Sequence, residues 1–506
     1  MWAAPYERNG SDPTRDDMAR YSDTECGFES DSDCNSDGYS SSSNDSSRSS
    51  SNGSSSSGLL DNSVNQSAKS RIHMYGIIRR TKCGYCSAEG NSQYLGARAH
   101  RLTCDDYQAL IDRGWRRSGN LLYLTDHKKA CCAYYTIRTS ALEAKLSSSD
   151  KKLLRKWRKI QRSEETQQHT TVGNTTTSTD SDKDDLVDSV LSSASGAVDM
   201  RIESASFSEE KYKVFERYQR EIHNDKKPTR HGFRDFLCSS PLIPQRISTP
   251  ASTKESKAST QVQVQQEQKQ LQQQQQVLPN NDFGSYHQCY YIKNRLVAVG
   301  VIDILPKCVS SVYLFYDTEF SYLSLGSYSS LREIALVRQL HRYVHPDINY
   351  YYMGYYIPSC SKMTYKARWR PSDMLDLVTM HWIPIERCLE RIRQHPLFTS
   401  FDPAIDSLNL VRDCTDDELQ FSPVLSLESI KCAPGWDSSD EEELHRLLGS
   451  VVIWVRSGAV QSIGIYQRVP ITLAQLTQIG QALSNFAFQI VAGLGNDLAK
   501  RMIISA

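Results

Sequence analysis

The stretch NRLVAVGVIDILPKCVSSVYLFYD, residues 294–317, carries the clearest structural signal in the chain. It consists of two runs rich in valine, isoleucine and aromatic residues, separated by the turn around Pro306. Residues of these types favour extended strands, so the stretch predicts two successive strands. Residues 322–344 then predict a passage from strand to helix, and NYYYMGYYI at 349–357 predicts the next strand. Together these segments predict a compact α/β domain over residues 282–401.

Composition divides the rest of the 506 residues into folded and low-complexity segments. The formal net charge is zero, but residues 1–68 hold twelve acidic and four basic residues, whereas residues 69–162 hold seven acidic and twenty-one basic ones. A serine-rich acidic segment buries too little apolar surface to fold, and a basic one favours a polyanionic partner. The expected segments are a disordered head (1–68), a basic cysteine-rich module (69–162), a disordered linker (163–203), a helical start of the α/β region (204–243), a disordered glutamine-rich insert (244–281), the main α/β domain (282–401), and an acidic loop followed by a strand and a helix that pack on that domain (402–506).

The chain has no apolar run of the eighteen or so residues that would span a bilayer, and its N-terminus is polar rather than signal-like. Its fourteen cysteines are mostly scattered singly through apolar segments, which indicates a reducing compartment. We therefore expect a soluble, intracellular protein with no membrane partner.

Two cysteine pairs stand apart from the scattered ones: CGYC at 83–86 and the doublet in HKKACCAYYTIR at 127–138. Adjacent cysteines rarely form a disulfide with each other because the geometry is strained. A C-x-x-C turn can place two thiolates on one ion, and a second pair completes a four-thiolate site. The expected ligands are Cys83, Cys86, Cys131 and Cys132.

Two questions about this site stay open at the level of sequence. Adjacent residues of a strand point to opposite faces, so one cysteine of the doublet could be a core residue. His100, Cys104 or His127 would then fill the fourth position. The metal could be zinc or a four-iron cluster, since both use four thiolates.

Basic residues cluster between and after the cysteine pairs. LIDRGWRRSG combines arginines with Trp115, and KKLLRKWRKIQR at 151–162 adds cations on one expected helix. Guanidinium groups bind phosphates, and aromatic planes stack on bases, so the pattern favours RNA over a merely solvated basic face. The expected RNA contacts are Arg113, Arg116, Arg117, Lys151, Lys152 and Arg155.

These segments closely resemble one family, the eukaryotic arginyl-tRNA–protein transferases of the N-degron pathway. The resemblance rests on CGYC, LIDRGWRRSG, CCAYYTIR, YLSLGSYSSLREIALVRQL and YYYMGYYIPSCSKMTYKARWRPSDML, which follow one another in the family's order. Ala133 stands where the family normally has proline. His100 matches a family position, whereas Cys104 does not.

The resemblance implies transfer of arginine from arginyl-tRNA to proteins that begin with Asp, Glu or oxidised Cys, which marks them for ubiquitin-dependent degradation. It also implies a catalytic fold like that of the GCN5-related acetyltransferases, a cytoplasmic location with the nucleus as a second one, and no use of ATP.

Coenzyme A is disfavoured because SLGSYSSL lacks a glycine-rich pyrophosphate cradle. The alternative is a non-catalytic metal-containing tRNA- or RNA-binding protein with a degenerate acyltransferase fold. The oligomeric state is left open.

Aminolysis of an ester needs a group that takes up the amine proton and donors for the oxyanion. Asp303 and Asp317, at strand ends, are the expected carboxylates, although each could merely cap a turn. Ser330 and Glu333 predict a capping box for a helix that begins near Ser329, where backbone N–H groups would bind a phosphate or the oxyanion. Gly326 would let the tRNA end approach closely.

An acidic acceptor demands a cation in its binding site. The candidates are Lys362, Lys366, Arg370 and, on the expected helix, Arg332, with Arg368 beside them. Some of these could instead contact tRNA phosphates, and Arg332 could simply be solvated. We expect Lys366 and Arg370 to contribute most.

Overall fold

A computed structural model describes residues 69–83, 85–86, 89–125, 130–165, 185–192, 197–247, 277–396 and 398–404, together with 452–457, 467–472, 494, 498 and 501–505. The expected disordered head and acidic loop lie outside these residues, as does most of the expected glutamine-rich insert. Among the described residues, no helix is both long and apolar enough to cross a membrane.

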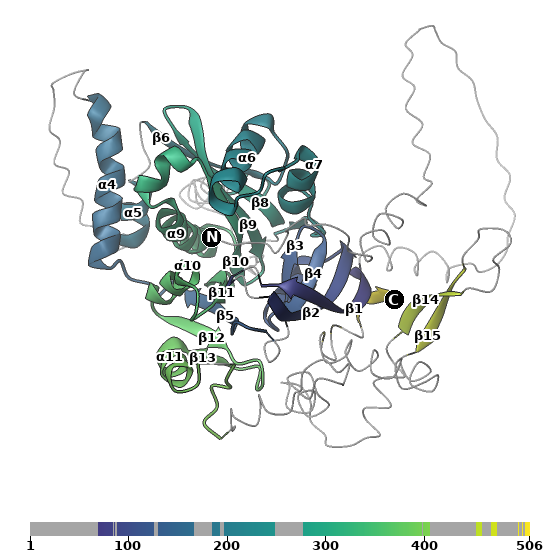
Figure 1. Ribbon diagram of the computed structural model, residues 1–506. Helices are drawn as coiled ribbons and strands as arrows, with labels where there is room; N and C mark the ends of the chain where they lie inside the picture. The colour runs from purple at the N-terminus through teal and green to yellow at the C-terminus, as the bar shows by residue number, and fades with distance from the viewer. Residues whose placement is uncertain are drawn as a thin grey trace, which may run out of the picture. The chain divides into compact units, whose positions relative to one another are not determined.

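The larger of two sheets has nine strands in the order β13-β12-β5-β11-β10-β9-β8-β6, with β7 paired to β8 (Figure 1). Val297, Val299 and Val301 are buried, as are the alternate residues Ala298 and Ile302, because helices cover this part of the sheet. The strands predicted from sequence are confirmed as β9, β10 and β11. The bounds are β5 Tyr135–Ser140, β6 Val198–Ser204, β7 Gln245–Arg246, β8 Asp282–Ile292, β9 Arg295–Leu305, β10 Cys308–Tyr316, β11 Tyr350–Tyr356, β12 Ser372–Leu375 and β13 Trp382–Pro384.

The parallel pairing of β10 with β11 in this sheet is short. Its register joins Cys308–Ser310 to Tyr350–Tyr352, whereas the pairing of β11 with β5 on its other side continues to Tyr355 and Tyr356. Both strands are irregular here: the β10–β9 register shifts between Ser311 and Tyr313, and Gly354 in β11 has a φ of 70°. Hydrogen bonding between β10 and β11 therefore ends at Ser310.

The helices around this sheet are α4 Ser148–Glu165, α5 Asp185–Leu191, α6 Glu209–His223, α7 Arg230–Phe233, η1 Arg234–Cys238, η2 Thr318–Leu323, α9 Leu325–Tyr343, α10 Ser361–Thr364, η3 Tyr365–Arg368 and α11 Ile385–Gln394. The helical start expected over residues 204–243 contains α6, and the Ser208 side chain caps this helix by accepting from the Lys211 N–H. The expected disordered linker is wrong in part, since α5 and β6 lie within it and β6 pairs with β8.

The crossover helix α9 begins earlier than predicted. It starts at Leu325, four residues before Ser329, and follows η2 rather than a strand. The capping box of Ser330 and Glu333 is therefore wrong: Ser330 donates to the Gly326 carbonyl inside the helix, and Glu333 is buried against the sheet. The apolar residues of α9 pack on β10 and β11. The stability gained from this packing outweighs the local capping signal, so the helix extends beyond it toward the N-terminus.

The second sheet has seven strands in the order β15-β14-β16-β1-β2-β4-β3 (Figure 1). The strand and helix expected within residues 402–506 were predicted to pack on the main domain. The strands β14 and β16 instead belong to this sheet, where β16 pairs with β1 in parallel and β14 pairs with β16, and most of the expected helix lies outside the described residues. The short helix α3 Cys104–Ile111 follows β2 and is capped by Thr103. The bounds are β1 Arg71–Lys82, β2 Glu89–Arg101, β3 Arg116–Ser118, β4 Leu121–Thr125, β14 Val452–Ser457, β15 Gln467–Thr472 and β16 Ile503–Ser505.

The expected basic module 69–162 is divided between the two sheets. Its strands β1 to β4 form the smaller sheet, but β5 pairs with β11 and β12 in the larger one. Helix α4 packs on α9, where Trp157 stacks on Tyr328 with ring centroids 3.8 Å apart. Residue 162 is therefore not a boundary between two domains, because β5 and α4, which precede it, pack with elements of the larger sheet.

Candidate metal centre and active-site cleft

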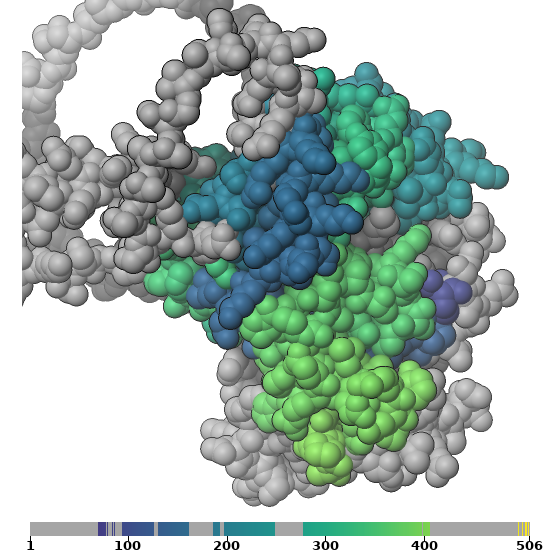
Figure 2. Space-filling view, turned by 90° about the vertical axis from the view of Figure 1, so that its left-hand side faces the viewer, coloured from purple at the N-terminus to yellow at the C-terminus, as the bar shows by residue number. Residues whose placement is uncertain are grey.

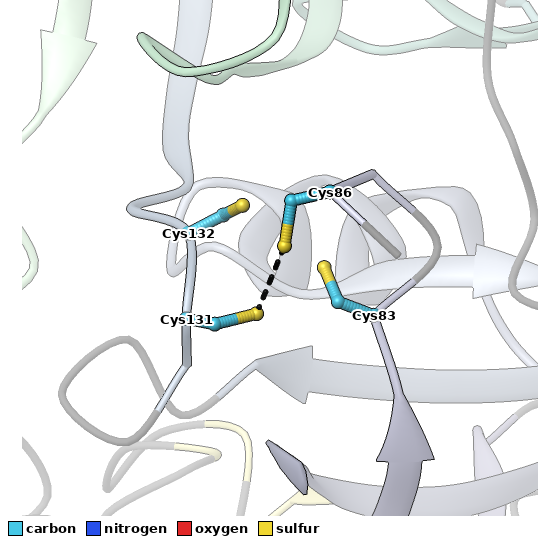
Figure 3. A group of neighbouring side chains, drawn as sticks. All are labelled: Cys83, Cys86, Cys131 and Cys132. Atoms are coloured by element: carbon cyan, nitrogen blue, oxygen red, sulfur yellow. Dashed lines mark hydrogen bonds between the residues drawn. The ribbon is translucent and has the colours of Figure 1, made fainter. Parts of the chain in front are cut away.

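The four predicted cysteines come together at one edge of the smaller sheet. Cys83 follows β1, Cys86 lies in the next turn, and Cys131 and Cys132 occupy a bend just before β5. All four sulfur atoms lie within 4.8 Å of one another, and the Cys86 and Cys131 sulfurs are 3.4 Å apart. Their side chains extend from two loops toward a common centre (Figure 3).

The bend explains how both residues of the doublet reach the same centre. Because Cys131 and Cys132 precede the strand, they do not alternate between faces as strand residues do. The alternative in which one cysteine of the doublet points away from the other thiols is therefore wrong, although Cys132 is also buried. Ala133, which stands where the related family has proline, is buried and does not prevent this geometry.

Hydrogen bonds hold two of the thiols in place. The Tyr134 hydroxyl and the Cys83 sulfur are 3.3 Å apart, and Ser359 donates to the Cys132 sulfur at 3.3 Å. Burial raises the pKa of Cys132 to about 12. Burial also acts to raise the pKa of Cys83, but the hydrogen bond from Tyr134 and backbone N–H groups outweigh it and lower the pKa to about 7.

The donor set fits a metal. A tetrahedral ion with zinc–sulfur bonds of about 2.3 Å would place its sulfurs roughly 3.8 Å apart, within the observed spread. Cys104 is not part of the group, because it is fully buried at the start of α3 and donates to the Ile243 carbonyl. His100 also lies outside the group, and His127 lies outside the described residues.

A cleft lies between the two sheets, at the level where β10–β11 pairing ends. The space inside it that a water-sized group can enter is about 20 Å³. One wall comes from α3, β3 and β4, and the other comes from β10 and η1. The lining residues are Tyr107, Arg116, Arg117, Ser118, Tyr123, Phe236, Ser310, Ser311, Val312 and Tyr313.

Arg116 and Arg117, predicted as RNA contacts, line this cleft and are only 6% exposed each. Arg117 donates to both carboxylate oxygens of Asp303, at 2.6 and 2.8 Å. Arg116 donates to the backbone carbonyls of Trp115 at 2.6 Å and Gly354 at 3.4 Å. Neither guanidinium faces solvent in a way that suits a tRNA backbone. Arg113, in contrast, is half-buried at the end of α3.

The two predicted carboxylates are both engaged with arginines. Asp303 is fully buried in β9, where Ser285 also donates to it at 2.6 Å, so its pair with Arg117 joins the two sheets. Asp317 follows β10, caps η2 and pairs with Arg217 at 2.7 Å and with Arg295. Burial acts to raise the pKa of Asp317, but hydrogen bonds from these arginines outweigh it and lower the pKa.

The predicted acceptor cations also have protein partners. Lys366 is buried and donates to the Tyr355 carbonyl at 2.8 Å; burial and the charge of Arg116 lower its pKa well below the usual value. Arg370 pairs with Glu386 at 2.7 Å, and Arg368 pairs with Asp150 at 2.5 Å. Arg332 donates to the Val190 carbonyl at 2.9 Å and so ties α5 to α9. Lys362 is exposed on α10.

The start of α9 does not place Ser329 at a helix end. Ser329 is buried in the second turn and donates to Glu333 at 2.5 Å. Gly326 does lie in the first turn, but a Cβ there would meet only an ordinary contact with Leu314 at 3.8 Å. The helix N-terminus thus lies at residues 325–327 rather than at Ser329.

The remaining predicted RNA contacts lie on α4. Lys151, Lys152 and Arg155 are exposed, whereas Leu154 and Trp157 are buried against the larger domain. In Figure 2 the residues of α4 (blue) lie on the face turned to the viewer, above the green residues that follow β11. This helix therefore presents a row of cations on an accessible surface.

Sequence reasoning missed two features of the site. Tyr313 lines the cleft, and its hydroxyl lies 3.3 Å from His223 Nε2 and accepts from Gln219 at 2.8 Å. Burial and the charge of Lys362 lower the pKa of His223 to about 4. The tyrosine was hidden in a strand pattern, and His223 is the last residue of α6; no spacing signal connects them.

Fold and site together define a mixed α/β protein with a cluster of four cysteines that could bind a metal ion and with a cleft between two sheets. Two family models match this chain. "Arginine-tRNA-protein transferase, N terminus" matches residues 81–152, and "Arginine-tRNA-protein transferase, C terminus" matches residues 210–376. The first match covers the cysteines, and the second covers β8 to β12.

Individual relatives agree with the family models. "Arginyl-tRNA--protein transferase 1" of Drosophila melanogaster is 32% identical over 428 residues, which cover 62% of this chain and 82% of the fly protein. The Saccharomyces cerevisiae protein of that name is 30% identical over 348 residues, covering 63% of each chain. A Campylobacter jejuni "Aspartate/glutamate leucyltransferase" is 40% identical over 94 residues, covering 19% of this chain and 36% of that protein. The chain therefore belongs to the arginyl-tRNA–protein transferase family and is an aminoacyltransferase.

Proposed function

We propose that this enzyme transfers arginine from arginyl-tRNA to the α-amine of proteins that begin with Asp, Glu or oxidised Cys. The observation that carries the proposal is the cleft at the end of the β10–β11 pairing, which lies within the span of the two family matches. A β-bulge at Ser311–Tyr313 leaves backbone groups there without a regular ladder, as is common beside active sites.

The reaction is the aminolysis of an ester. The acceptor nitrogen forms a bond to the carbonyl carbon of the arginyl ester, and the bond from that carbon to the ribose oxygen breaks. The attacking nitrogen loses a proton, and the departing ribose oxygen gains one. The ester is already activated, so neither ATP nor coenzyme A takes part in this proposal.

The proton route that we propose runs through Tyr313 to His223. Tyr313 lines the cleft, and its hydroxyl lies 3.3 Å from the imidazole Nε2. Because burial and the charge of Lys362 lower the pKa of His223 to about 4, the ring is neutral near pH 7, so it can pass on a proton from the Tyr313 hydroxyl but does not retain it. Asp303 and Asp317 then act by positioning: Asp303 holds Arg117 in the cleft wall, and Asp317 fixes η2 ahead of α9.

The exposed cations of α4 are the proposed tRNA-binding surface. Lys151, Lys152 and Arg155 lie on one accessible side of a helix whose apolar side is docked. Lysine and arginine contacts to phosphate supply most of the affinity for RNA without reading its sequence. Gly326, in the first turn of α9, stays our proposal for the place where the aminoacylated end of the tRNA passes.

We propose that the four cysteines hold a single metal ion rather than an iron–sulfur cluster. The spread of the sulfur atoms, 4.8 Å at most, supports one tetrahedral ion such as zinc. Such an ion supplies no redox chemistry and would fix the loop after β1 against the bend before β5. Elemental analysis and visible absorption of purified protein test this: stoichiometric zinc without a visible iron–sulfur band supports it.

We also propose that the nine-stranded sheet with α6 and α9 corresponds to the GCN5-related acyltransferase fold. The mixed sheet with a parallel crossover through α9 supports this proposal. Marking of acceptors for ubiquitin-dependent degradation, in the cytoplasm and the nucleus, completes the proposed role. Fractionation of cells that produce a tagged protein tests the location.

The central test is an arginine-transfer assay. Purified protein is incubated with arginyl-tRNA that carries labelled arginine and with peptides that begin with Asp, Glu or Ala. We expect label to move to the Asp and Glu peptides. Label that stays on the tRNA would overturn the proposal and favour a non-catalytic RNA-binding protein, and equal label on the Ala peptide would overturn the acidic preference.

A further inference from the structure

Two neighbouring arginines of β3 line the cleft in different electrostatic states. Arg117 has a carboxylate partner, Asp303, that neutralises its charge. The hydrogen bonds of Arg116 go instead to the backbone carbonyls of Ile111, Trp115 and Gly354. Its Nε is buried and has no hydrogen-bond partner among the described residues. A buried donor without a partner is costly, and a ligand that accepts from it removes that cost.

The described residues that line the cleft offer Arg116 no acidic partner. Lys366 is buried nearby, and burial together with the charge of Arg116 lowers its pKa well below the ordinary value, so Arg116 carries the charge here. Apart from Arg116 and Arg117, every residue that lines the cleft is a tyrosine, a phenylalanine, a valine or a serine. The cleft thus has a fixed cation and hydroxyl donors, and no acidic residue in its lining. Such a site attracts an anion, and walls that exclude water strengthen the attraction.

The shape of the cleft indicates how large that anion is. The bulge in β10 places Ser311 and Val312 in the lining, next to the end of the β10–β11 ladder. Backbone groups of such an edge can pair with an extended peptide, which would direct its first side chain toward Arg116. The space inside it that a water-sized group can enter is about 20 Å³, which limits the entering group to one as small as a carboxylate.

We propose that this cleft is the subsite for the acidic side chain of the acceptor's first residue, and that Arg116 binds its carboxylate. The proposal rests on the arginine-transfer function proposed above and assigns acceptor selectivity to one residue. It also replaces our expectation from the sequence. Arg370 and Arg332 already have protein partners, and Lys362 is exposed on α10. A fork of parallel N–H groups suits a carboxylate better than an ammonium does.

The experiment compares acceptor peptides that differ in one group. Peptides that begin with Asp or with Asn have nearly the same shape, and only the first carries the charge. With saturating arginyl-tRNA, kcat/KM is measured for both peptides with the wild-type enzyme, Arg116→Gln and Arg116→Lys. Arg393→Gln serves as the matched control, because Arg393 is an exposed arginine on α11 that pairs only with Glu390 and a helix carbonyl among the described contacts.

We expect Arg116→Gln to lower kcat/KM for the Asp peptide by roughly 100-fold or more, mainly through KM, and to leave the Asn peptide nearly unchanged. Arg116→Lys retains the charge without the fork and should lose about tenfold of the Asp-over-Asn preference. The KM for arginyl-tRNA should not change, and Arg393→Gln should behave like the wild type.

The outcomes separate this inference from the proposed function. A wild-type enzyme that transfers arginine to no peptide overturns the function itself. A wild type that prefers Asp, together with a folded Arg116→Gln that keeps the same preference, overturns only the role of Arg116. If circular dichroism shows that Arg116→Gln is unfolded, Arg116→Lys decides: an unchanged Asp-over-Asn ratio in that variant overturns the inference.

Discussion

The cations of α4 and those of β3 look alike in the sequence and lie in opposite environments. Lys151, Lys152 and Arg155 are exposed on a helix. Arg116 and Arg117 are 6% exposed each, in a strand between two sheets. The first group is available to a large polyanion, and the second only to a group small enough to enter a cleft. The charge of a basic segment therefore indicates only that an anion binds. The burial of its side chains decides how large that anion can be.

The difference arises from the residues that anchor each element. In α4 the apolar residues Leu154 and Trp157 face the protein, which leaves the lysines on the outer side. In β3 the three-residue strand is paired with β4 and lies over the larger sheet, so its arginines point into the interface. Asp303 compensates one of them.

Loss of the cysteine cluster should give the largest effect, because the bend at Cys131 and Cys132 connects the smaller sheet to β5 of the larger one. Cys83→Ser removes one of four ligands, and structural zinc sites contribute on the order of 10 kcal/mol to the folding of small domains. We expect bound metal to fall to a small fraction of stoichiometric and the melting temperature to fall with it. Elemental analysis and thermal unfolding measure both.

Cys238→Ser is the matched control, because Cys238 is partly buried in η1 and lies outside the cluster. It should keep the wild-type metal content. Full metal content in Cys83→Ser would show that Cys83 is not a ligand.

Removal of Asp303, the carboxylate that pairs with Arg117, should give the next largest effect, a loss of folding stability. Asp303→Ala leaves a buried guanidinium without its carboxylate, and breaking a buried pair from one side costs about 3–5 kcal/mol. Denaturant unfolding measures the loss. Asp373→Ala is the control: Asp373 pairs with Arg138 at 3.3 Å and its side chain is 28% exposed, so about 1 kcal/mol or less is expected. Equal losses in both variants would contradict the inter-sheet role of Asp303.

The exposed group is tested by its effect on tRNA affinity. The triple variant Lys151→Gln, Lys152→Gln, Arg155→Gln keeps good helix formers and removes three charges. If all three contact phosphates, the slope of log binding constant against log salt concentration should become shallower by about 2–3. Filter binding at several salt concentrations measures the slope. Lys226→Gln with Lys227→Gln, which changes two exposed lysines after α6, should leave it unchanged. An unchanged slope in the triple variant would remove α4 from the interface.

The smallest expected effect concerns Glu333, a buried acid that, unlike Arg117, has no oppositely charged partner in the described contacts. Burial raises the pKa of Glu333 above its ordinary value, although Ser329 and Tyr351 donate to it and act to lower it. The folded state then binds the proton more tightly than the unfolded state does, so this group favours folding at low pH. That contribution is lost as the pH rises from about 4.5 through the folded pKa, and each pH unit between the unfolded and folded pKa values accounts for about 1.4 kcal/mol.

Glu333→Gln removes the titration while keeping the shape and an acceptor for Ser329. We expect the stability of the variant relative to the wild type to increase between pH 4.5 and neutral pH. Urea unfolding at several pH values gives the difference, and a difference that is independent of pH would show that the pKa of Glu333 is not raised.

Local patterns predicted the parts of the molecule that local forces determine. The strands β9 to β11 and the helix α6 follow from runs of residues whose side chains all favour one conformation, and the C-x-x-C turn with the cysteine doublet indicated which four thiols meet. Patterns failed where distant segments compete. Ser330 and Glu333 form a good capping signal, yet the packing of α9 on the sheet extends the helix to Leu325.

The same limit applies to the site. Nothing near Asp303 in the sequence indicates that Arg117 lies against it, because the pair joins residues from two sheets. The pairing of β5 with β11 and of β16 with β1 is likewise set by long-range register. The sequence could therefore identify which side chains carry the chemistry more reliably than which of them share a cleft.

The place of β16 has a consequence for the order in which the molecule folds during synthesis. Residues 503–505 form the strand between β1 and β14, near the middle of the smaller sheet. A ribosome makes β1 to β4 early, but that sheet lacks a central strand until residue 505 has been added. Every strand of the larger sheet precedes residue 385, so the nascent chain can complete the larger sheet before the smaller one receives β16.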